Sequence, residues 1–403
     1  MNYLELFRTH KVIRDLSLVQ LIAYFGAWFS NVAIYTLLVQ LGSTELAISV
    51  VTAMHFLPAV IIAPLSGAII DRFKIKPLML TLIAIELVMT LLFLTIDSKN
   101  EIWLLMIFIF IRMSAASMFF SSEMSLLAKL LKGPALQKAN ELHSIIWSFT
   151  YAAGMAISGI VVNIVGVKTA FIIDSFFFIF AFIFFTTISF EIKSSNHSEK
   201  ISSLIKNGFI YLKNNKIIMH LIILHASVGL TTFDALITLL AKNEYKFLIA
   251  VPLSIGISNA IRAVALMIGP LILSKYVNKH NLHYLLFFQG IAIILWAFVQ
   301  ESFYMSLFAL FFVGLSTTTL WSITYALIQE KTQEKFLGRI IAYNDMFFML
   351  VCTLITLFIG LMTTLATLDI ITALLGIGFV IFSYYYSRIL KWIWMKKFFY
   401  LQF

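Results

Sequence analysis

Long apolar segments alternate with short polar turns from one end of the chain to the other. Each segment is about 20 residues or longer, the length that an α-helix needs to cross a bilayer, whereas a membrane-spanning strand needs only about 9–11 residues. The pattern therefore predicts an all-α integral membrane protein with twelve transmembrane helices, at residues 16–40, 46–70, 77–97, 102–127, 141–166, 168–190, 216–241, 248–274, 283–300, 303–328, 340–362 and 368–390.

The longest polar segment, residues 191–216, lies between the sixth and seventh predicted helices. It predicts two pseudo-symmetric six-helix halves, 1–190 and 217–403, joined by a cytoplasmic linker. A faint similarity between 125–142 and 326–345 supports an internal repeat, and transporters of this architecture bind substrate between the halves near the bilayer midplane. Apolar residues at helical spacing in the linker predict an amphipathic helix on the membrane surface; a flexible linker is the alternative.

Composition and charge agree with a membrane protein and set its orientation. The chain is 61% hydrophobic and 12% charged, whereas soluble domains are about 25% charged. Of the 29 Lys and Arg residues, 23 fall in loops on the side of the two termini and four on the other side. Basic loops favour the cytoplasm, so we expect a multi-pass protein of the inner or plasma membrane with both termini cytoplasmic. The basic residues are scattered over short loops, and nucleic-acid binding is not expected.

The turn after the second predicted helix concentrates charge in the stretch GAIIDRFKIK. Gly67, Asp71 and Arg72, followed by a short basic run, resemble the cytoplasmic loop motif of the major facilitator superfamily. Ile75 stands where that motif usually has a Gly. The resemblance implies that this loop latches the cytoplasmic gate, with Asp71 accepting hydrogen bonds from a basic partner or a helix N-terminus. The alternative for the basic residues is that they only fix topology.

The resemblance extends over nearly the whole chain and is greatest to a drug-efflux branch that contains macrolide and enterobactin exporters. The matching stretches are FIRMSAAS with Arg112, AFIIDSFFF with Asp174, and LIQEKTQEKFLGR, in which Gly338 and Arg339 are expected to take part in gating. One departure is that the fifth helix has GMAISG without the Pro that such exporters often carry, which leaves the direction of transport open.

Seven charged residues stand out in predicted helices because they lie away from the first and last few residues, and a charge inside the membrane is costly and usually has a partner or a function. Burial disfavours the charged form of a carboxyl group, so Glu86 and Asp234 are the predicted proton-coupling residues; the alternative for Glu86 is a fixed pairing with an Arg. Glu123 and Asp345 are expected to pair with loop cations. For Asp174 a cap or gate role is expected.

Arg112 and Arg262 lie at mid-depth, one in each predicted half. Arg binds carboxylates through two parallel hydrogen bonds, so the two residues together predict an anionic substrate held between the halves. The alternative is that each Arg is paired internally, with Glu86 or Asp234 for example.

Two predicted helices carry a stripe of polar and aromatic residues on one face, as expected for the wall of a central cavity. Small hydroxyl residues also pack helices closely in lipid, so the coincidence of two stripes at symmetry-related positions matters more than any one residue. The stripes comprise Gln20, Tyr24, Trp28, Asn31 and Tyr35 in the first helix, and Ser227, Thr231, Asp234 and Thr238 in the seventh.

No HExxH, CxxC or Walker motif occurs in the chain, so neither an enzyme, nor a metal site, nor another cofactor is predicted. The predicted function is proton-coupled export of an amphiphilic, anionic small molecule, such as a siderophore or a drug, by a monomer. The alternatives are import of a similar anion, such as a carboxylate siderophore, and a non-transporting membrane receptor or scaffold.

Overall fold

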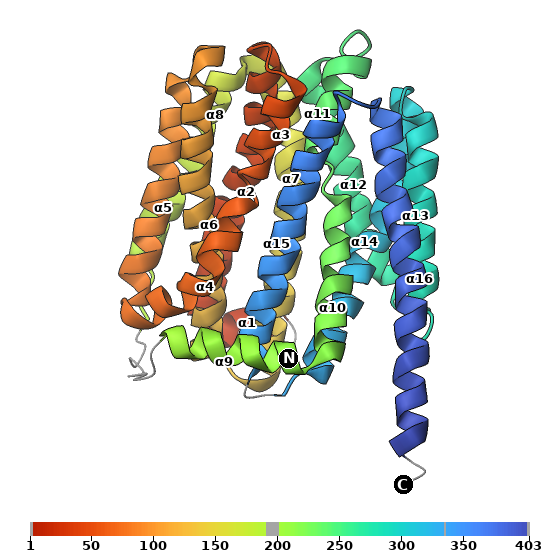
Figure 1. Cartoon of the computed structure of the whole chain (residues 1–403). Helices are drawn as coiled ribbons and strands as arrows, with labels where there is room; N and C mark the ends of the chain where they lie inside the picture. The colour runs from red at the N-terminus through yellow and green to blue at the C-terminus, as the bar shows by residue number, and fades with distance from the viewer. Residues whose placement is uncertain (1–2, 191–200, 334–335, 401–403) are drawn as a thin grey trace. The chain divides into compact units, whose positions relative to one another are not determined.

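The computed structural model describes residues 3–190, 201–333 and 336–400, and all of its regular secondary structure there is helical (Figure 1). Short 3₁₀ or π turns connect or extend several of the helices: η1 (Phe93–Thr95), η2 (Lys99–Glu101), η3 (Ser227–Thr231) and η4 (Ala241–Tyr245). The α-helices are α1 (Tyr3–Thr9), α2 (Lys11–Gln40), α3 (Glu45–Ala53), α4 (Leu57–Arg72), α5 (Ile75–Leu92), α6 (Ile102–Leu130), α7 (Gly133–Val165), α8 (Val167–Thr187), α9 (Ile201–Asn214), α10 (Lys216–Ala226), α11 (Asp234–Leu240), α12 (Val251–Leu273), α13 (Leu282–Val299), α14 (Phe303–Lys331), α15 (Leu337–Met362) and α16 (Leu368–Tyr400).

Twelve helical stretches in the described residues are long and apolar enough to cross a bilayer, from Lys11–Gln40 to Leu368–Arg388. They overlap all twelve predicted spans, so the predicted all-α membrane fold is confirmed. The tight turn between the fifth and sixth spans is made by Gly166, whose φ of 83° lies in a region that favours glycine. Because this residue takes that conformation, α7 ends at Val165 and α8 begins at Val167.

Two of the predicted spans are interrupted. The second span is divided into α3 and α4 by a turn at residues 54–56. The seventh span is divided into α10 and α11 by the 3₁₀ turn η3 (Ser227–Thr231) and two non-helical residues. In the latter break, the Thr231 and Thr232 hydroxyls donate to the carbonyl oxygens of Val228 and Gly229. Such local side-chain bonds compete with regular helix geometry.

The chain forms two compact units, which we describe separately. Unit 1 comprises Met1–Lys200 and Ile237–Ala260, and unit 2 comprises Ile201–Leu236 and Ile261–Phe403. One boundary falls within the predicted linker 191–216, and a segment on either side of the loop between α11 and α12 belongs to unit 1. The division into halves at 1–190 and 217–403 stays a prediction.

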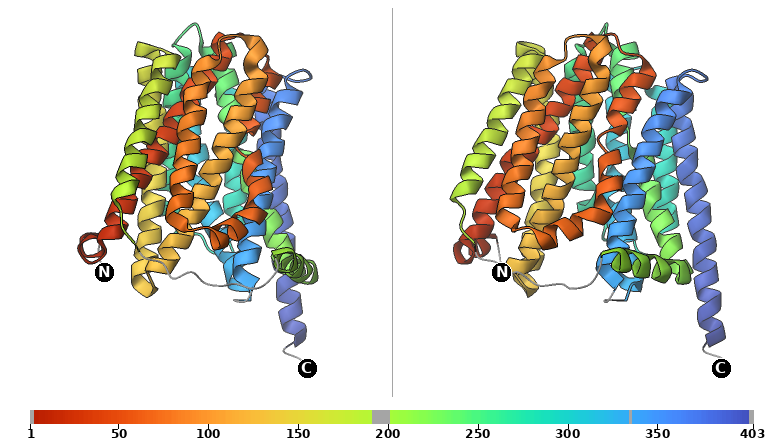
Figure 2. Two further views of the ribbon diagram at one scale, coloured as in Figure 1. Left: turned by 90° about the vertical axis from the view of Figure 1, so that its left-hand side faces the viewer. Right: turned by 60° about the vertical axis from the view of Figure 1, so that its left-hand side comes forward.

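In unit 1, α2 packs against α7 and α8, while α5 packs against α6 and α8 and α4 packs against α6 (Figure 2). The core between these helices is apolar, with Ile83, Phe119 and Phe178 almost completely buried. Hydrophobic burial alone does not hold helices together in lipid, where close packing of small residues contributes instead. An example is the crossing of α7 with α12, where a methyl group at Gly159 would lie 2.8 Å from the Pro252 carbonyl oxygen and 3.1 Å from Gly256 Cα.

In unit 2, α13 packs along α16 and against α14, and α10 packs against α14 and α15 (Figure 1). The α13–α16 contact is again close, because a methyl group at Gly290 would lie 2.7 Å from the Gly376 carbonyl oxygen. The linker contains the helix α9, on which Tyr211 stacks with Phe336 at a ring-centroid distance of 4.2 Å. Residues 201–214 are helical, and the predicted amphipathic character and membrane-surface position of this helix stay predictions; residues 191–200 lie outside the described residues.

Candidate functional site

A buried ion pair joins α6 and α8 in the core of unit 1. Arg112 Nη2 lies 3.1 Å from Asp174 Oδ2, and the exposed fractions of the two side chains are 3% and 0%. Ser30 on α2 donates a hydrogen bond to the same carboxylate. The Arg112 guanidinium also lies over the rings of Phe93 and Phe178, at 5.6 and 5.2 Å from their centroids. Such cation–π contacts stabilise a desolvated cation, so Arg112 is held entirely within its own unit.

Glu86 on α5 adds a second carboxyl group to this cluster. Its side chain is buried, and it interacts electrostatically with Arg112 and Asp174. His55 also interacts electrostatically with Arg112, and its Nδ1 lies 3.2 Å from the Thr52 carbonyl oxygen. With His55 neutral, the cluster holds two carboxyl groups against one guanidinium. Because an unbalanced buried charge is costly, the cluster favours binding one proton, and Glu86 is the carboxyl group outside the direct ion pair.

Asp174 is the partner of Arg112, which the sequence analysis did not identify. The two residues are 62 positions apart, and Asp174 was expected to act as a cap or gate. Gly26 provides space for the carboxylate, because a methyl group there would lie 2.5 Å from Asp174 Oδ1. The small residue at position 26 of α2 was the only sequence signal for this contact.

Arg262 bridges the break between α10 and α11 in unit 2. Its Nη2 donates a hydrogen bond of 3.0 Å to the Thr231 carbonyl oxygen, and the guanidinium lies 5.4 Å from the Phe233 ring centroid. It also interacts electrostatically with Asp234, the first residue of α11. Arg262 Nη1 is buried and has no hydrogen-bond partner among the described residues. Arg112 Nε is likewise buried without a partner among the described residues, so the two guanidiniums differ mainly in that Arg112 binds a carboxylate and Arg262 binds a backbone carbonyl oxygen.

The polar stripe of α2 contacts other side chains of unit 1. Gln20 Nε2 donates to the His143 carbonyl oxygen at 3.1 Å, and the Tyr24 hydroxyl donates to Glu123 Oε2 at 3.2 Å. Trp28 packs edge-on against Tyr151 and Trp147 on α7, at centroid distances of 4.6 and 5.5 Å, and Tyr35 lies 5.7 Å from His55. Asn31 is 6% exposed. The second stripe does not form one helical face, because the break after η3 interrupts it.

The two carboxylates expected to pair with loop cations have other neighbours. Glu123 is bonded by Tyr24 and lies 3.7 Å from His143 Nδ1 on α7. Asn344 Nδ2 donates to Asp345 Oδ1 at 3.2 Å. We expected Glu123 to pair with a loop cation, and that expectation was wrong. Its neighbours are the Tyr24 hydroxyl and the His143 imidazole, inside the helix bundle of unit 1.

The predicted gating residues lie at the ends of helices. Gly67 and Asp71 belong to α4, but their side-chain surroundings lie outside what the structure describes; Arg72 is exposed. Lys76 donates hydrogen bonds of 2.8 and 2.6 Å to the carbonyl oxygens of Thr186 and Ile188. It therefore caps the C-terminal end of α8, a structural role beyond fixing topology.

In unit 2, Arg339 lies over the Phe336 ring at 5.6 Å from its centroid, near the start of α15. Gly208 of α9 approaches it closely, since a methyl group there would lie 3.1 Å from Arg339 Cβ. Gly338 is exposed, and an added methyl group would meet no atom within 4 Å. The gating roles of these residues stay predictions.

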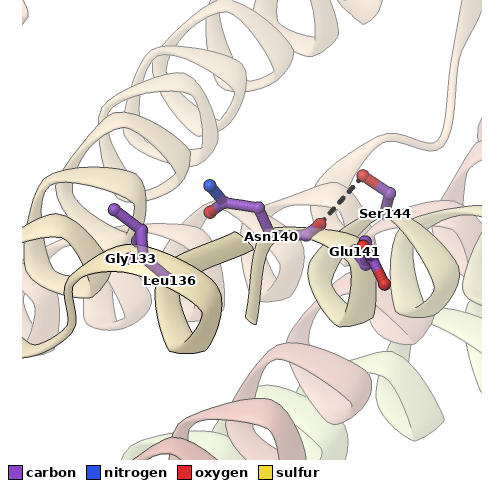
Figure 3. Close-up of a pocket in the computed structure, with 5 residues that line it drawn as sticks. All are labelled: Gly133, Leu136, Asn140, Glu141 and Ser144. Atoms are coloured by element: carbon purple, nitrogen blue, oxygen red, sulfur yellow. Dashed lines mark hydrogen bonds between the residues drawn. The ribbon is translucent and has the colours of Figure 1, made fainter. Parts of the chain in front are cut away.

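An open depression lies along the first turns of α7 in unit 1 (Figure 3). Its lining includes Asn140 and Ser144, which are joined by a hydrogen bond of 3.1 Å from the Ser144 hydroxyl to the Asn140 carbonyl oxygen. The other lining residues are Gly133, Leu136 and Glu141. None of these residues was a sequence-predicted site residue. In the part of the chain that the structure describes, no group of His, Cys, Asp and Glu could hold a metal ion.

Comparison with known proteins identifies the family. The sequence profile of the Major Facilitator Superfamily matches residues 16–356. Macrolide efflux protein A of Streptococcus pyogenes is 23% identical over 330 residues, covering 77% of this chain and 79% of that protein. The uncharacterized MFS-type transporter YfiS of Bacillus subtilis (strain 168) is 27% identical over 220 residues. That match covers 53% of this chain, and the chain spans about half the length of YfiS, 52%.

Solved transporters share the fold at low sequence identity. The nucleoside transporter NupG superposes with a TM-score of 0.73 at 12% identity, covering 94% of this chain and 99% of that chain. A D-xylose-proton symporter superposes with a TM-score of 0.72 at 11% identity, covering 93% and 97%. The fold is that of a membrane transporter rather than an enzyme, and the chain belongs to the Major Facilitator Superfamily.

Proposed function

We propose that this protein is a proton-coupled exporter of an amphiphilic small molecule. The observation that carries the proposal is the surplus carboxyl group in the core of unit 1, where Glu86 joins the ion pair of Arg112 and Asp174. A carboxyl group that alternates between a neutral and a charged form in apolar surroundings is what proton coupling requires. The Arg112–Asp174 pair is the fixed part of the cluster, and Glu86 is the part that gains and loses the proton.

Coupling follows from the cost of the charged state. With a proton on Glu86 the cluster is neutral, and without it the cluster carries one uncompensated negative charge in the protein interior. A ligand that binds one of these two states more tightly shifts the balance between them, and by linkage its binding or release changes proton occupancy. Asp234 beside Arg262 is the second proposed proton-binding residue, in unit 2.

The substrate is proposed to be amphiphilic, with an anionic group. In unit 2, Trp321 stacks with Tyr325 at a centroid distance of 4.7 Å, and in unit 1 Trp28 and Trp147 meet edge-on. Trp147 and Trp321 are each more than a third exposed, and we propose that their rings contact the apolar part of the substrate. The unpaired donor of Arg262 suits a carboxylate, whereas Arg112 is already bound to Asp174; we therefore assign the anion contact to Arg262.

Export is favoured by the similarity to macrolide efflux protein A, which covers most of both chains. Import remains the alternative, and the D-xylose-proton symporter shares only the fold. The distribution of Lys and Arg supports the further proposal that the protein lies in the inner or plasma membrane with both termini cytoplasmic. A monomer is sufficient for the proposed mechanism.

Transport in everted membrane vesicles tests the proposal. Vesicles with and without the protein receive an inside-acidic pH gradient and a panel of macrolides, carboxylate dyes and siderophores, and accumulated compound is measured by mass spectrometry. We expect accumulation of at least one compound that requires the protein and stops when nigericin collapses the gradient. Uptake that does not depend on the pH gradient would contradict proton coupling. Accumulation only in vesicles of native orientation would contradict export.

A further inference from the structure

A second group of buried titratable side chains lies in unit 1, apart from the ion pair. Tyr24 on α2, Glu123 on α6 and His143 on α7 are in contact: the Tyr24 hydroxyl lies 3.2 Å from Glu123 Oε2, and His143 Nδ1 lies 3.7 Å from the same oxygen. The side chains of His143 and Glu123 are 6% and 3% exposed. Phe120 packs edge-on against the imidazole, with ring centroids 5.1 Å apart.

This group has spare hydrogen-bonding capacity. Both imidazole nitrogens of His143 and the Oδ1 atom of Asn140 are buried without a hydrogen-bond partner in the described residues. Buried polar atoms are nearly always satisfied in folded proteins, so each exception calls for an explanation. A group that passes a proton must accept it on one side and donate it on the other, and the two imidazole nitrogens of His143 are available for these two steps.

The group connects in two directions. Toward the core, Tyr24 interacts electrostatically with Glu86 as well as with Glu123. Toward solvent, Asn140 lies three residues before His143 on α7, on the same helix face. Asn140 and Ser144 both line the open depression of Figure 3. The group therefore has Glu86 as an electrostatic neighbour on one side and, one helical turn from His143, a residue that lines a solvent-exposed surface of unit 1 on the other.

We propose that Tyr24, Glu123 and His143 form a proton relay between Glu86 and the depression on α7. The inference rests on the proposed role of Glu86 in coupling. In the outward step, Tyr24 donates its hydroxyl proton to the Glu123 carboxylate and receives the Glu86 proton, directly or through a bridging water. Glu123 then passes a proton to His143 Nδ1, and the imidazolium releases the Nε2 proton to water at the depression. Tyr24, Glu123 and His143 regain their starting charges, Glu86 is left ionised, and one proton has moved to water. His143 is left protonated on Nδ1 and returns to the Nε2–H tautomer by exchange with water before the next transfer.

Several charged or titratable groups lie on the elements around this path. Arg112 and Asp174 are its neighbours at the inner end, as partners of Glu86. At the outer end, Glu141 lines the depression and bonds Lys138 at 2.6 Å. Gln20 of α2 holds the backbone of α7 through its bond to the His143 carbonyl oxygen. A purely structural role for Glu123, as the acceptor that fixes Tyr24, is the alternative to be separated from the relay.

A pH jump on the purified full-length protein in lipid nanodiscs tests the relay without a substrate. Stopped-flow infrared spectroscopy follows the carboxyl C=O absorption, and the Glu86 signal is the part that Glu86→Gln removes. Positioned proton-transfer groups contribute about 10²–10⁴-fold to rates, so Glu123→Gln should slow protonation of Glu86 at least about tenfold. The final amplitude of the Glu86 signal should be unchanged in this variant. Formate, as a diffusible proton carrier, should restore the rate. His143→Gln should show the same slow rate, unchanged amplitude and rescue as Glu123→Gln.

Glu141→Gln is the matched control, because Glu141 lies on the same helix and in the depression but outside the relay, and its rate should equal that of the wild type. An unchanged rate in Glu123→Gln would overturn the relay. If Glu86 is protonated slowly in Glu123→Gln, formate does not restore the rate and the amplitude is altered, then Glu123 has a structural role. That result would also overturn the relay. If the wild type and Glu86→Gln show the same carboxyl signal, the proposed coupling site itself is wrong. This outcome is distinct from failure of the relay alone, in which the Glu86 signal is present but its rate does not depend on Glu123.

Discussion

Arg112 and Arg262 look alike in the sequence but differ in their surroundings. Arg112 is enclosed by an ion pair and two aromatic rings, whereas Arg262 donates to a backbone carbonyl oxygen and lies over one ring. Removing one partner of a buried ion pair leaves an uncompensated charge, which costs about 3–5 kcal/mol. A group whose donors are free for a ligand should matter less for stability and more for binding.

We therefore predict that Arg112→Ala lowers the thermal stability of the purified protein strongly, in keeping with that cost. Arg262→Lys should leave stability nearly unchanged and weaken binding of an anionic substrate about tenfold or more. Lys keeps the charge but lacks the planar guanidinium that binds a carboxylate through two hydrogen bonds. Thermal unfolding in detergent and substrate binding by calorimetry measure the two effects. The assignment fails if Arg262→Lys unfolds early with unchanged affinity, or if Arg112→Ala is as stable as the wild type.

The sequence identified which residues are unusual but not how they pair. Glu86, Arg112, Asp174 and Glu123 all stood out because they are charged within apolar segments. Their partners depend on which helices pack side by side, and Arg112 and Asp174 meet only because α6 and α8 both contribute to the core of unit 1. Apart from the small residue at position 26 of α2, the sequence carries no signal for that contact.

At the scale of the elements, hydrophobicity predicted the number and approximate position of the membrane helices. It did not predict the interruptions at residues 54–56 and after η3, because the chain stays apolar across both. Local hydrogen bonds of Thr231 and Thr232 decide the second break. The expectation of a regular polar face on the seventh helix depended on continuous helical geometry and therefore could not hold there.

The crossing of α7 and α12 in unit 1 depends on glycine, whereas a salt bridge elsewhere in unit 1 is expected to add little. Lys242 Nζ lies 2.9 Å from Glu45 Oε1, but both side chains are partly exposed, and such pairs contribute less than about 1 kcal/mol. A methyl group at Gly159 would instead clash with the backbone of α12, and overpacking costs about 1–3 kcal/mol.

Gly159→Ala should therefore lower the unfolding temperature more than Lys242→Ala does. Gly338→Ala is the matched glycine control, because its methyl group would meet no atom within 4 Å, and it should not lower stability. Unfolding of all three variants is followed by differential scanning fluorimetry. Equal effects of Gly159→Ala and Gly338→Ala would show that the close crossing does not contribute to stability.

At the scale of the whole molecule, charge predicts orientation while the fold alone does not. Lys99 and Lys279 lie in loops predicted to face opposite sides of the membrane. The single native cysteine, Cys352, is buried, so cysteines introduced at these positions can be labelled against a low background. Lys99→Cys should react with a membrane-impermeant maleimide in intact cells and Lys279→Cys only in everted vesicles. The reverse pattern would invert the proposed topology.

The central claim is that the core of unit 1 binds one proton at Glu86 and exchanges it during transport. Infrared difference spectroscopy of the purified protein, with and without a compound found to be transported, tests it most directly. We predict a protonated carboxyl signal at neutral pH that decreases when the compound binds and is missing from Glu86→Gln, while the Glu141→Gln control retains it. A Glu86→Gln spectrum that superimposes on that of the wild type, with the same response to the compound, would contradict the account.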